Sequence, residues 1–379
     1  MRIAFFTDTY RPSMDGVVRS IDVFRSGLKR RGHTVKIFAP APPHAHLHER
    51  GVSYAPSISF PTYPQYRIPL HMGGLAEDTE KFGPDIIHSH AMVRMGLAAR
   101  DAARRADVPL VGTFHTLLPE ATHYIMPLPH LRGWTGRRLW DYLRWFYSPF
   151  DSVLAPSRFM QKQLSEHGIG SSVLPTPVDT AKFHPGKKIG NRKMAGQGNG
   201  KRTGQDMFLF VGRIAKEKNL DFLLHIAHTH EFKKMNARML IAGDGPYRHE
   251  LEKKVHHQHL GHSVHLLGKV PEKELAPLYR SASCVIQPSK FETQGLTALE
   301  AMACGTPVAV HAGTALAEVV EPGRNGECFG NSAEEAAEAI GKIIERRSSY
   351  SVAARKRAME YSVEKCTKKL LEVYRKVRK

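Results

Sequence analysis

Cysteine is scarce in this chain, and the spacings that cysteine-dependent folds need are missing. The four cysteines form no CxxC pair and have no histidine partners at the spacing of a metal site; they are Cys284, Cys304, Cys328 and Cys366. This pattern argues against a disulfide framework and against a zinc module, and it favours a reducing compartment. The alternating histidines His44, His46 and His48 lie in a polar, proline-rich stretch and are interpreted as a solvated loop.

Long apolar runs are also missing. No stretch approaches the ~20 residues that a membrane span needs. The apolar start, residues 1–6, breaks at Thr7 and Asp8 and is too short for the core of a signal peptide. We therefore expect a cytoplasmic protein of two ordinary globular domains, since the 379 residues include 41% hydrophobic and 24% charged residues.

Negative charge is in short supply, and its shortage is uneven. The chain holds 55 Lys and Arg against 36 Asp and Glu, which gives a net charge of +19. Residues 207–350 are balanced, with 17 of each sign, so all of the excess lies in residues 1–206 and 351–379. A basic surface confined to one part of a protein attracts phosphate-rich partners, either nucleic acid or anionic lipid.

Apolar strand-like runs alternate with helical runs along the chain, which predicts an α/β protein with two doubly wound parallel sheets. The strands of the first sheet are expected at residues 2–6, 34–39, 86–88, 110–115 and 152–155, and those of the second at 208–211, 238–242, 264–267, 284–287 and 307–310. Residues 1–175 are assigned to the first domain, 176–206 to a basic, flexible linker, 207–350 to the second domain and 351–379 to a basic amphipathic helix.

The most informative segment is residues 284–310. Glu292 and Glu300 flank a loop that runs from a predicted buried strand into a predicted helix, which ends before Gly305 and Pro307. Such a helix start favours anions and hydroxyl-rich ligands, and ligands of open α/β sheets bind at this edge. The alternative is a capping carboxylate at Glu292 and a solvated helix charge at Glu300.

This segment resembles the E-x7-E region of retaining glycosyltransferase family 4, whose members have the GT-B fold of two Rossmann-like domains with a last helix that crosses back to the first domain. The match runs from Pro288 to Val308, and it departs at Thr293-Gln294, where the family often has Gly-Phe or Pro-Phe. The resemblance implies a donor site for a nucleotide sugar, formed by Glu292, Thr293, Gln294, Gly295, Leu296 and Glu300.

Other motifs extend the resemblance over nearly the whole chain. Gly16 stands in the first strand-to-helix loop, where the family brings its backbone to the donor phosphates; the alternative is an ordinary tight turn. His115 ends the fourth strand, where the family's histidine reaches the donor sugar; the alternative is a core histidine. Arg213 and Lys218 match the residues that bind the diphosphate, with a solvated basic loop as the alternative. Val270 matches a loop that packs on the nucleobase.

The resemblance implies a hexosyltransferase that retains the anomeric configuration, with His115, Glu292, Arg213 and Lys218 as catalytic residues. No metal is expected, because no DxD motif stands at a strand end. No cofactor is expected either, since the nucleoside-diphosphate sugar is the donor substrate. Glucose from UDP-glucose is the expected donor sugar. Mannosyl or other hexosyl transfer to phosphatidylinositol, a polysaccharide or a small molecule is the alternative.

A lipid acceptor is expected because the Arg- and Trp-rich stretch 131–147 and the opening loop look most like the diacylglycerol glucosyltransferase branch. As a helix this stretch places Trp140, Leu143 and Tyr147 on one stripe, with Arg137, Arg138 and Arg144 at its margins. Tryptophan and arginine together suit a membrane interface, which predicts peripheral attachment to anionic lipid. The alternative is a core helix of the first domain.

Two rival functions remain open from the sequence. A nucleotide-sugar 2-epimerase has a similar two-sheet fold, but the segment around Glu292 argues against it. A nucleic-acid-binding protein would suit the net charge, but the sequence contains no motif for DNA or RNA, and no specific nucleic acid is expected as a partner. The oligomeric state is not indicated.

Overall fold

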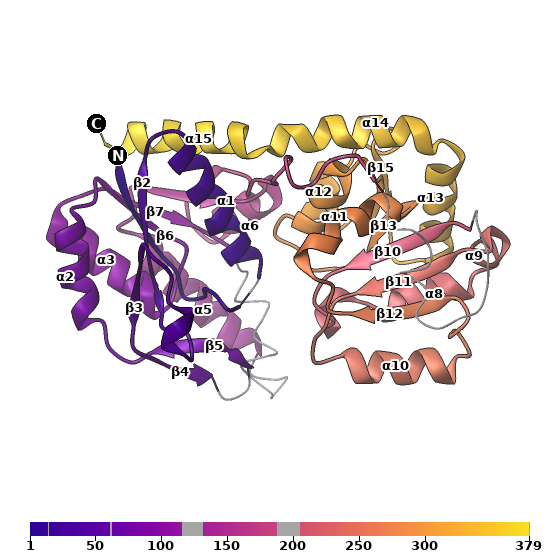
Figure 1. Ribbon diagram of the computed structural model, residues 1–379, viewed down its shortest axis with the longest axis horizontal. Helices are drawn as coiled ribbons and strands as arrows, with labels where there is room; N and C mark the ends of the chain where they lie inside the picture. The colour runs from indigo at the N-terminus through magenta and orange to yellow at the C-terminus, as the bar shows by residue number, and fades with distance from the viewer. Residues whose placement is uncertain (14, 61–62, 116–131, 188–204, 379) are drawn as a thin grey trace. The chain divides into compact units, whose positions relative to one another are not determined.

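The chain folds into two compact units, each built around a parallel sheet (Figure 1). The structure is a computed structural model, and it describes residues 1–13, 15–60, 63–115, 132–187 and 205–378. The first unit comprises Met1–Pro177 together with Val363–Lys379, and the second comprises Val178–Ser362. The last helix therefore belongs to the first unit although it follows the second in sequence.

The first unit contains a seven-stranded sheet in the order β3-β2-β1-β6-β7-β8-β9, with every neighbouring pair parallel. Its strands are β1 (Arg2–Phe6), β2 (Thr34–Pro40), β3 (Val52–Ala55), β6 (Ile86–Ser89), β7 (Leu110–Thr113), β8 (Ser152–Ala155) and β9 (Ser172–Val173). Its helices are α1 (Gly16–Arg30), α2 (Gly73–Phe82), α3 (Arg94–Ala106), α5 (Arg132–Tyr147), α6 (Arg158–Glu166) and α15 (Val363–Val377). An antiparallel hairpin of β4 (Ser57–Phe60) and β5 (Tyr63–Pro69) stands apart from the sheet.

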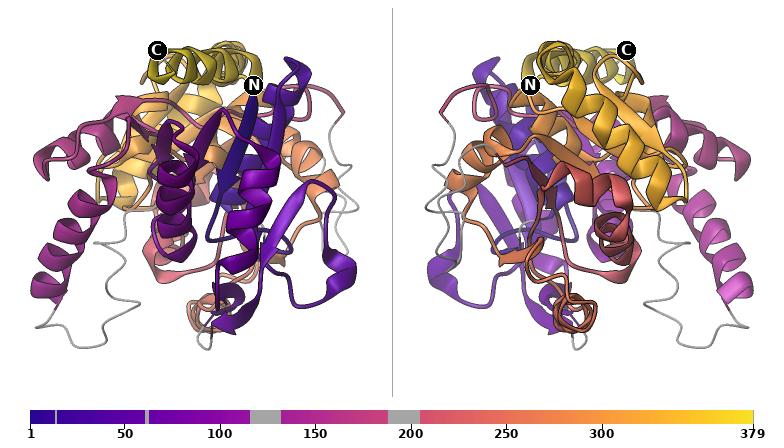
Figure 2. Two further views of the ribbon diagram at one scale, coloured as in Figure 1. Left: turned by 90° about the vertical axis from the view of Figure 1, so that its left-hand side faces the viewer. Right: turned by 90° about the vertical axis from the view of Figure 1, so that its right-hand side faces the viewer.

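Helix α15 is held to the first unit by burial and by hydrogen bonds, among them one from Arg31 Nη2 to the carbonyl of Glu364. It lies beside α1 (Figure 1; Figure 2), where a Cβ on Gly27 of α1 would stand 2.2 Å from the Thr367 hydroxyl of α15. The phenol of Tyr374 is fully buried and bonds to His88 of β6 at 2.6 Å. A buried hydroxyl needs such a partner, because an unpaired one costs about 1–3 kcal/mol.

The second unit contains a six-stranded parallel sheet in the order β12-β11-β10-β13-β14-β15. Its strands are β10 (Met207–Val211), β11 (Arg238–Ala242), β12 (Val264–Gly268), β13 (Cys284–Gln287), β14 (Val308–His311) and β15 (Gly326–Phe329). Its helices are α8 (Asp221–His228), α9 (His230–Met235), α10 (Arg248–His257), α11 (Glu272–Ser281), α12 (Leu296–Ala303), α13 (Ala333–Glu345) and α14 (Arg347–Ala358).

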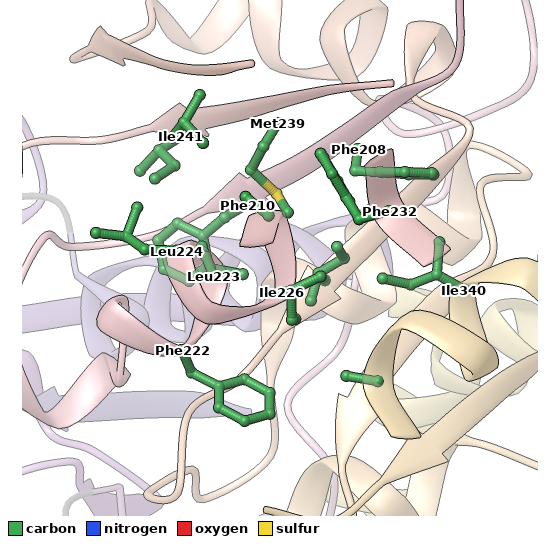
Figure 3. Packing of buried hydrophobic residues seen from close by; sticks show 14 of the residues in the cluster. Phe208, Phe210, Phe222, Leu223, Leu224, Ile226, Phe232, Met239, Ile241 and Ile340 are labelled. Carbon is green, nitrogen blue, oxygen red and sulfur yellow. The ribbon is translucent and has the colours of Figure 1, made fainter. Parts of the chain in front are cut away.

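Apolar side chains on one face of this sheet pack against α8, α9 and α13. Phe208 and Met239 from the strands meet Phe232 of α9 and Ile340 of α13, all buried (Figure 3). Strands covered by helices on both faces have near-continuous apolar sequences, which is why runs such as residues 207–211 identify this sheet from sequence.

The predicted fold class is confirmed: both units are α/β with parallel sheets, and the chain returns to the first unit at its end. All ten predicted strands exist within a residue or two of the expected bounds. The single helix expected over residues 351–379 is wrong. The structure has α14, a short 3-10 turn at Met359–Tyr361 and then α15, and only α15 belongs to the first unit. Most of the expected linker, residues 188–204, lies outside the described residues.

Helix α5 is a core helix, so the expected membrane-facing aromatic stripe is wrong. Trp140, Leu143 and Tyr147 are at most 9% exposed, and Trp140 stacks on the ring of His167 with centroids 3.7 Å apart. An aromatic stripe at helical spacing packs equally well on a sheet, and here the whole stripe is buried in the protein. The flanking side chains of Arg137, Arg138 and Arg144 are exposed. Within the described residues, no helix is long and apolar enough to cross a bilayer.

Candidate active site

Apart from Val270, the predicted donor residues of the second unit lie at the point where the strand order reverses. The sheet runs outward in one direction from β10 through β11 and in the other from β13 through β14. The loops after β10 and β13 leave the same edge of the sheet side by side, and ligands of open α/β sheets bind in the crevice between such loops. Lys218 comes from the first loop and Glu292 from the second.

Lys218 and Glu292 form an ion pair across this switch point. The Lys218 ammonium lies 2.6 Å from Glu292 Oε1, and the two side chains are only 20% and 17% exposed. Hydrogen bonds between the two loops hold this pair in place. The amide of the Asn219 side chain donates to the carbonyl of Pro288, and the hydroxyl of Ser289 donates to the carbonyl of Glu217.

Arg213 forms an ion pair within its own loop. Its Nη2 lies 2.7 Å from Glu217 Oε1, and the arginine side chain is 41% exposed whereas the glutamate is 9% exposed. Glu217, which is half-buried, therefore holds the guanidinium of Arg213 at the loop that also carries Lys218. Two cations from one short loop stand at the edge of the sheet, which suits the binding of a diphosphate.

Helix α12 begins at the same place. Gly295 precedes it with φ +86°, and a Cβ there would lie 2.1 Å from a methyl of Leu316. Only glycine suits this position, because a left-handed backbone and a side-chain clash coincide. Thr293 and Leu296 are half-buried and Gln294 is buried, so the loop is packed and not splayed into solvent.

Glu300 lies one turn further into α12 and is buried, at 5% exposure. Its Oε2 accepts a hydrogen bond from the hydroxyl of Tyr279 on α11 at 2.8 Å. The interpretation of Glu300 as a solvated helix charge is therefore wrong. Tyr279 is a residue that the sequence analysis missed, because nothing in the spacing of residues 279 and 300 relates them.

The turn after β11 supports the same loops from the other side. Gly243 and Gly245 have φ +147° and +159°, and Cβ atoms there would stand 1.8 and 2.3 Å from the carbonyl oxygens of Gly212 and Ile214. The amide of Ile214 donates in turn to the carbonyl of Asp244. Val270, after β12, is half-buried and packs against the apolar cluster around β13 and α12.

The two predicted residues of the first unit lie at the carboxyl edge of its own sheet. Gly16 is the first residue of α1, and Asp15 caps this helix by accepting from the amides of Val17 and Val18. His115 follows β7, and its Nε2 lies 2.8 Å from Nδ1 of His90, which follows β6. The pattern His-Ser-His at the end of β6 was a signal that could have pointed to His90.

A half-buried carboxylate, also missed from sequence, organises this edge. Asp8 accepts hydrogen bonds from the amides of Met92, Val93 and Met95 at 2.9–3.0 Å and so caps the start of α3. Burial raises the pKa of Asp8, while the three amides act to lower it. The described residues contain no group of three or more His, Cys, Asp or Glu side chains placed to hold a metal ion.

Comparison with known proteins identifies the family. Residues 14–182 match "Glycosyltransferase Family 4", and residues 192–362 match "Glycosyl transferases group 1". The alpha-monoglucosyldiacylglycerol synthase of Streptococcus pneumoniae is 32% identical over 82% of this chain and 71% of its own length. The chain belongs to glycosyltransferase family 4. It is a hexosyltransferase that uses a nucleotide-sugar donor.

Further relatives of this glycosyltransferase differ in sugar and acceptor. A GDP-mannose-dependent alpha-mannosyltransferase of Mycobacterium tuberculosis is 27% identical over the whole of this chain and 97% of its own length. Among solved structures, sucrose-phosphate synthase of Thermosynechococcus elongatus superposes with a TM-score of 0.78 at 20% identity, covering 99% and 98% of the two chains. Anabaena HepE in complex with UDP-glucose gives 0.75 at 19% identity, covering 99% and 100%. These two structures support the fold.

Proposed function

We propose that this glycosyltransferase moves glucose from UDP-glucose to diacylglycerol or a closely similar lipid, with the anomeric configuration retained and without a metal ion. The observation that supports the donor half is the Lys218–Glu292 ion pair at the switch point of the second sheet. A pair of opposite charges stands where transfer creates opposite charges, on the leaving diphosphate and on the sugar.

The positive groups of the site act on the leaving group. As the bond between the sugar's anomeric carbon and the diphosphate oxygen breaks, the diphosphate gains negative charge. Arg213 and Lys218 neutralise that charge, and the amides at the start of α12 add to them. Because these groups are held in place before the reaction, they need little reorganisation when the charge develops, and a metal ion is not required.

The remaining predicted residues serve the sugar and the nucleoside. Glu292 lies by the donor sugar, which becomes oxocarbenium-like, and His115 reaches the sugar near its 6-position. Glu300, held by Tyr279, binds the ribose hydroxyls, and the loop at Val270 packs on the nucleobase while Gly16 approaches the phosphates. A same-face path retains the configuration: the acceptor hydroxyl attacks the face that the diphosphate leaves, and a phosphate oxygen takes the hydroxyl's proton.

The lipid acceptor is supported by the named relatives and by the charge of the first unit. Two of the relatives, from Streptococcus pneumoniae and Acholeplasma laidlawii, are alpha-monoglucosyldiacylglycerol synthases. A hollow beside α1 is lined by four cations and two carboxylates, Arg25, Lys29, Arg30, Arg50, Asp22 and Glu49. The positive charge of Arg25 lowers the pKa of Lys29, as expected where cations crowd together.

These cations and the exposed arginines of α5 form the basis for reversible attachment to an anionic membrane. Each Lys or Arg close to such a surface contributes about 1 kcal/mol, so a few suffice. The buried aromatic stripe of α5 contributes nothing to this attachment. Mannosyl transfer is the second candidate, because the mannosyltransferase of Mycobacterium tuberculosis matches over the entire chain.

A screen of donors against acceptors tests the proposal. The purified protein is given radiolabelled UDP-glucose, UDP-galactose or GDP-mannose. Each donor is tested with phosphatidylglycerol vesicles that contain diacylglycerol, phosphatidylinositol or no acceptor, and every reaction contains EDTA. We expect label in the lipid fraction with UDP-glucose and diacylglycerol alone. Transfer from GDP-mannose to phosphatidylinositol would favour the second candidate, and an isomerised sugar nucleotide in the tube without acceptor would favour an epimerase.

A further inference from the structure

Three histidine rings form a row at the carboxyl edge of the first sheet, with His88 and His90 buried and His115 half-buried. His88 is in β6, His90 follows it, and His115 follows the neighbouring strand β7. The ring centroids of His88 and His90 are 4.2 Å apart, and those of His90 and His115 are 5.2 Å apart, with the planes of both pairs inclined by 26°. Of the three, only His115 has a proposed part in the transfer of the sugar.

At the two ends of the row, His88 and His115 bond to polar groups. His90, which lies between them, has a single polar partner. His88 bonds through Nδ1 to the Tyr374 hydroxyl at 2.6 Å and through Nε2 to the Thr113 hydroxyl at 2.7 Å. His90 bonds through Nδ1 to Nε2 of His115 at 2.8 Å. Its Nε2 is buried, and among the described residues no group bonds to it.

The rings are neutral at physiological pH, so the bond between His90 and His115 holds one proton. Burial lowers the pKa of His115 to about 4 and lowers the pKa of His90 well below its ordinary value. A proton on Nε2 of His90 would be a buried donor without an acceptor, which is rarer and costlier in proteins than an unpaired acceptor. The proton of His90 therefore lies on Nδ1, which donates to Nε2 of His115.

From this geometry we infer that His90 is a positioning residue: its Nδ1–H fixes the tautomer and the ring orientation of His115, so that His115 carries its proton on Nδ1 and acts as an N–H donor. A hydrogen bond to one ring nitrogen decides which form the other nitrogen takes. The inference rests on the proposed function in one respect, namely that His115 contacts the donor sugar. A neutral N–H donor suits a sugar hydroxyl, which accepts it without a change of charge.

A purely structural role is the competing explanation, and the surroundings of His90 allow it to be separated. The ring packs edge-on against Phe5 with centroids 4.7 Å apart, so a phenylalanine at position 90 would fill the same space without an N–H. His90→Phe removes the donor and keeps the ring. His90→Asn keeps a polar nitrogen near the position of Nδ1 and loses the rest of the ring.

Histidine 15N NMR of the full-length protein reads the tautomer directly. In the unaltered protein we expect His115 to carry its proton on Nδ1. In His90→Phe we expect that preference to be lost and kcat/KM to fall about 10-fold or more, the low end of the effect of losing an outer partner that fixes an imidazole at metal sites. His90→Asn should restore the tautomer and most of kcat/KM.

Two control variants complete the design. His265 of β12 also has a buried Nε2 without a partner among the described residues, but it lies in the second unit, so His265→Phe should leave both the tautomer of His115 and kcat/KM unchanged. His115→Ala reports on the proposed function itself. We expect it to lose at least as much activity as His90→Phe.

The outcomes separate the inference from the function on which it rests. A proton on Nε2 of His115 in the unaltered protein would overturn the inference without any variant. An active His90→Phe protein beside an inactive His115→Ala protein would also overturn it, while leaving the role of His115 intact. Full activity in His115→Ala would overturn both. If His90→Phe does not fold, the spectrum of the unaltered protein and the Asn variant still decide.

Discussion

At the scale of single residues, the ion pair between Lys218 and Glu292 sets opposite charges where the diphosphate and the sugar are proposed to lie. Lys218→Ala should reduce kcat/KM on the order of 10²-fold, because one charge-stabilising group typically contributes ~3–4 kcal/mol to the transition state. The measurement is steady-state kinetics on protein whose circular dichroism and melting temperature show that it is folded.

A neighbouring lysine provides the matched control for this change. Lys216 lies two residues away, is 74% exposed and pairs with Glu250 on α10. Exposed ion pairs contribute little, so Lys216→Ala should behave like the unaltered protein. Equal turnover in both variants would remove Lys218 from the chemistry and leave it as a structural partner of Glu292.

The histidines at the carboxyl edge of the first sheet make the stability of the first unit depend on pH. Burial lowers the pKa of His88 to about 3 and that of His115 to about 4, whereas histidines of an unfolded chain titrate near 6.5. Below about pH 6.5 the unfolded state therefore binds protons that the folded state excludes. The free energy of unfolding should be constant above that pH and fall as the pH drops toward 4, by about 1.4 kcal/mol per pH unit for each histidine.

Tryptophan fluorescence during urea unfolding measures this dependence in the first unit alone. All three tryptophans, Trp134, Trp140 and Trp145, lie in α5. His88→Gln should reduce the slope between pH 6.5 and 4 by one histidine's share. A slope of zero or of the opposite sign in the unaltered protein would mean that these rings are charged in the folded state.

At the scale of secondary-structure elements, the turn between β11 and α10 is a fixed support of the donor site. Gly243→Ala would place a Cβ 1.8 Å from the carbonyl oxygen of Gly212 in a backbone conformation that L-residues rarely adopt. We expect it to destabilise the second unit by about 3 kcal/mol or more, since backbone atoms cannot move aside as a flexible side chain does. Calorimetry should show the melting transition of the second unit at lower temperature.

Gly261 is the matched control for this element. It precedes β12, its φ is not positive, and a Cβ added there would meet no described atom within 4 Å. Gly261→Ala should leave the transition unchanged or raise it slightly. If both variants melt alike, the turn is looser than its close backbone contacts indicate.

Most of the strands could be predicted from sequence, and the exceptions have physical reasons. Strands such as Met207–Val211 are apolar throughout because helices cover both faces, and that pattern is unambiguous. Strands β3, β9 and β15 were not predicted, because they are short strands of mixed polarity at the edges of the sheets. The stripe on α5 was assigned to a membrane because an apolar helix face fits a sheet and a lipid surface equally well.

The candidate site was likewise predicted only in part from the sequence. Lys218 and Glu292 were predicted as members of one site from motif resemblance, and the structure brings them to 2.6 Å. Tyr279, which holds Glu300, could not be predicted, because side-chain pairing between α11 and α12 depends on the packed structure. Glu217, four residues after Arg213 in the same loop, was not singled out from the sequence. His90 could have been proposed from its place at a strand end, two residues from another histidine.

At the scale of the whole molecule, the uneven charge supports the proposed attachment of the first unit to an anionic membrane. The second domain, residues 207–350, carries no net charge, whereas exposed cations gather near α1 of the first unit. Lys29→Glu, Arg30→Glu and Arg50→Glu together should abolish flotation with phosphatidylglycerol vesicles at low salt. Salt should weaken the attachment of the unaltered protein, because exposed charges are screened.

The same change of charge in the other unit is the control. Lys233, Lys234 and Lys253 are exposed in the second unit, and changing all three to Glu should leave flotation near that of the unaltered protein. Equal losses in both triple variants would mean that net charge alone governs the attachment. Equal recovery of the unaltered protein on anionic and neutral vesicles would assign the basic surface to another partner.

Retaining transfer of glucose at the Lys218–Glu292 site is the central claim, and the linkage of the product tests it most directly. Purified protein is incubated with UDP-glucose, diacylglycerol in phosphatidylglycerol vesicles, and EDTA, and the isolated glycolipid is examined by proton NMR. We predict an α-linked glucosyl lipid, formed by the unaltered protein and at about 1% of that rate or less by Lys218→Ala. A β-linked product, or the same rate from both proteins, would contradict the account.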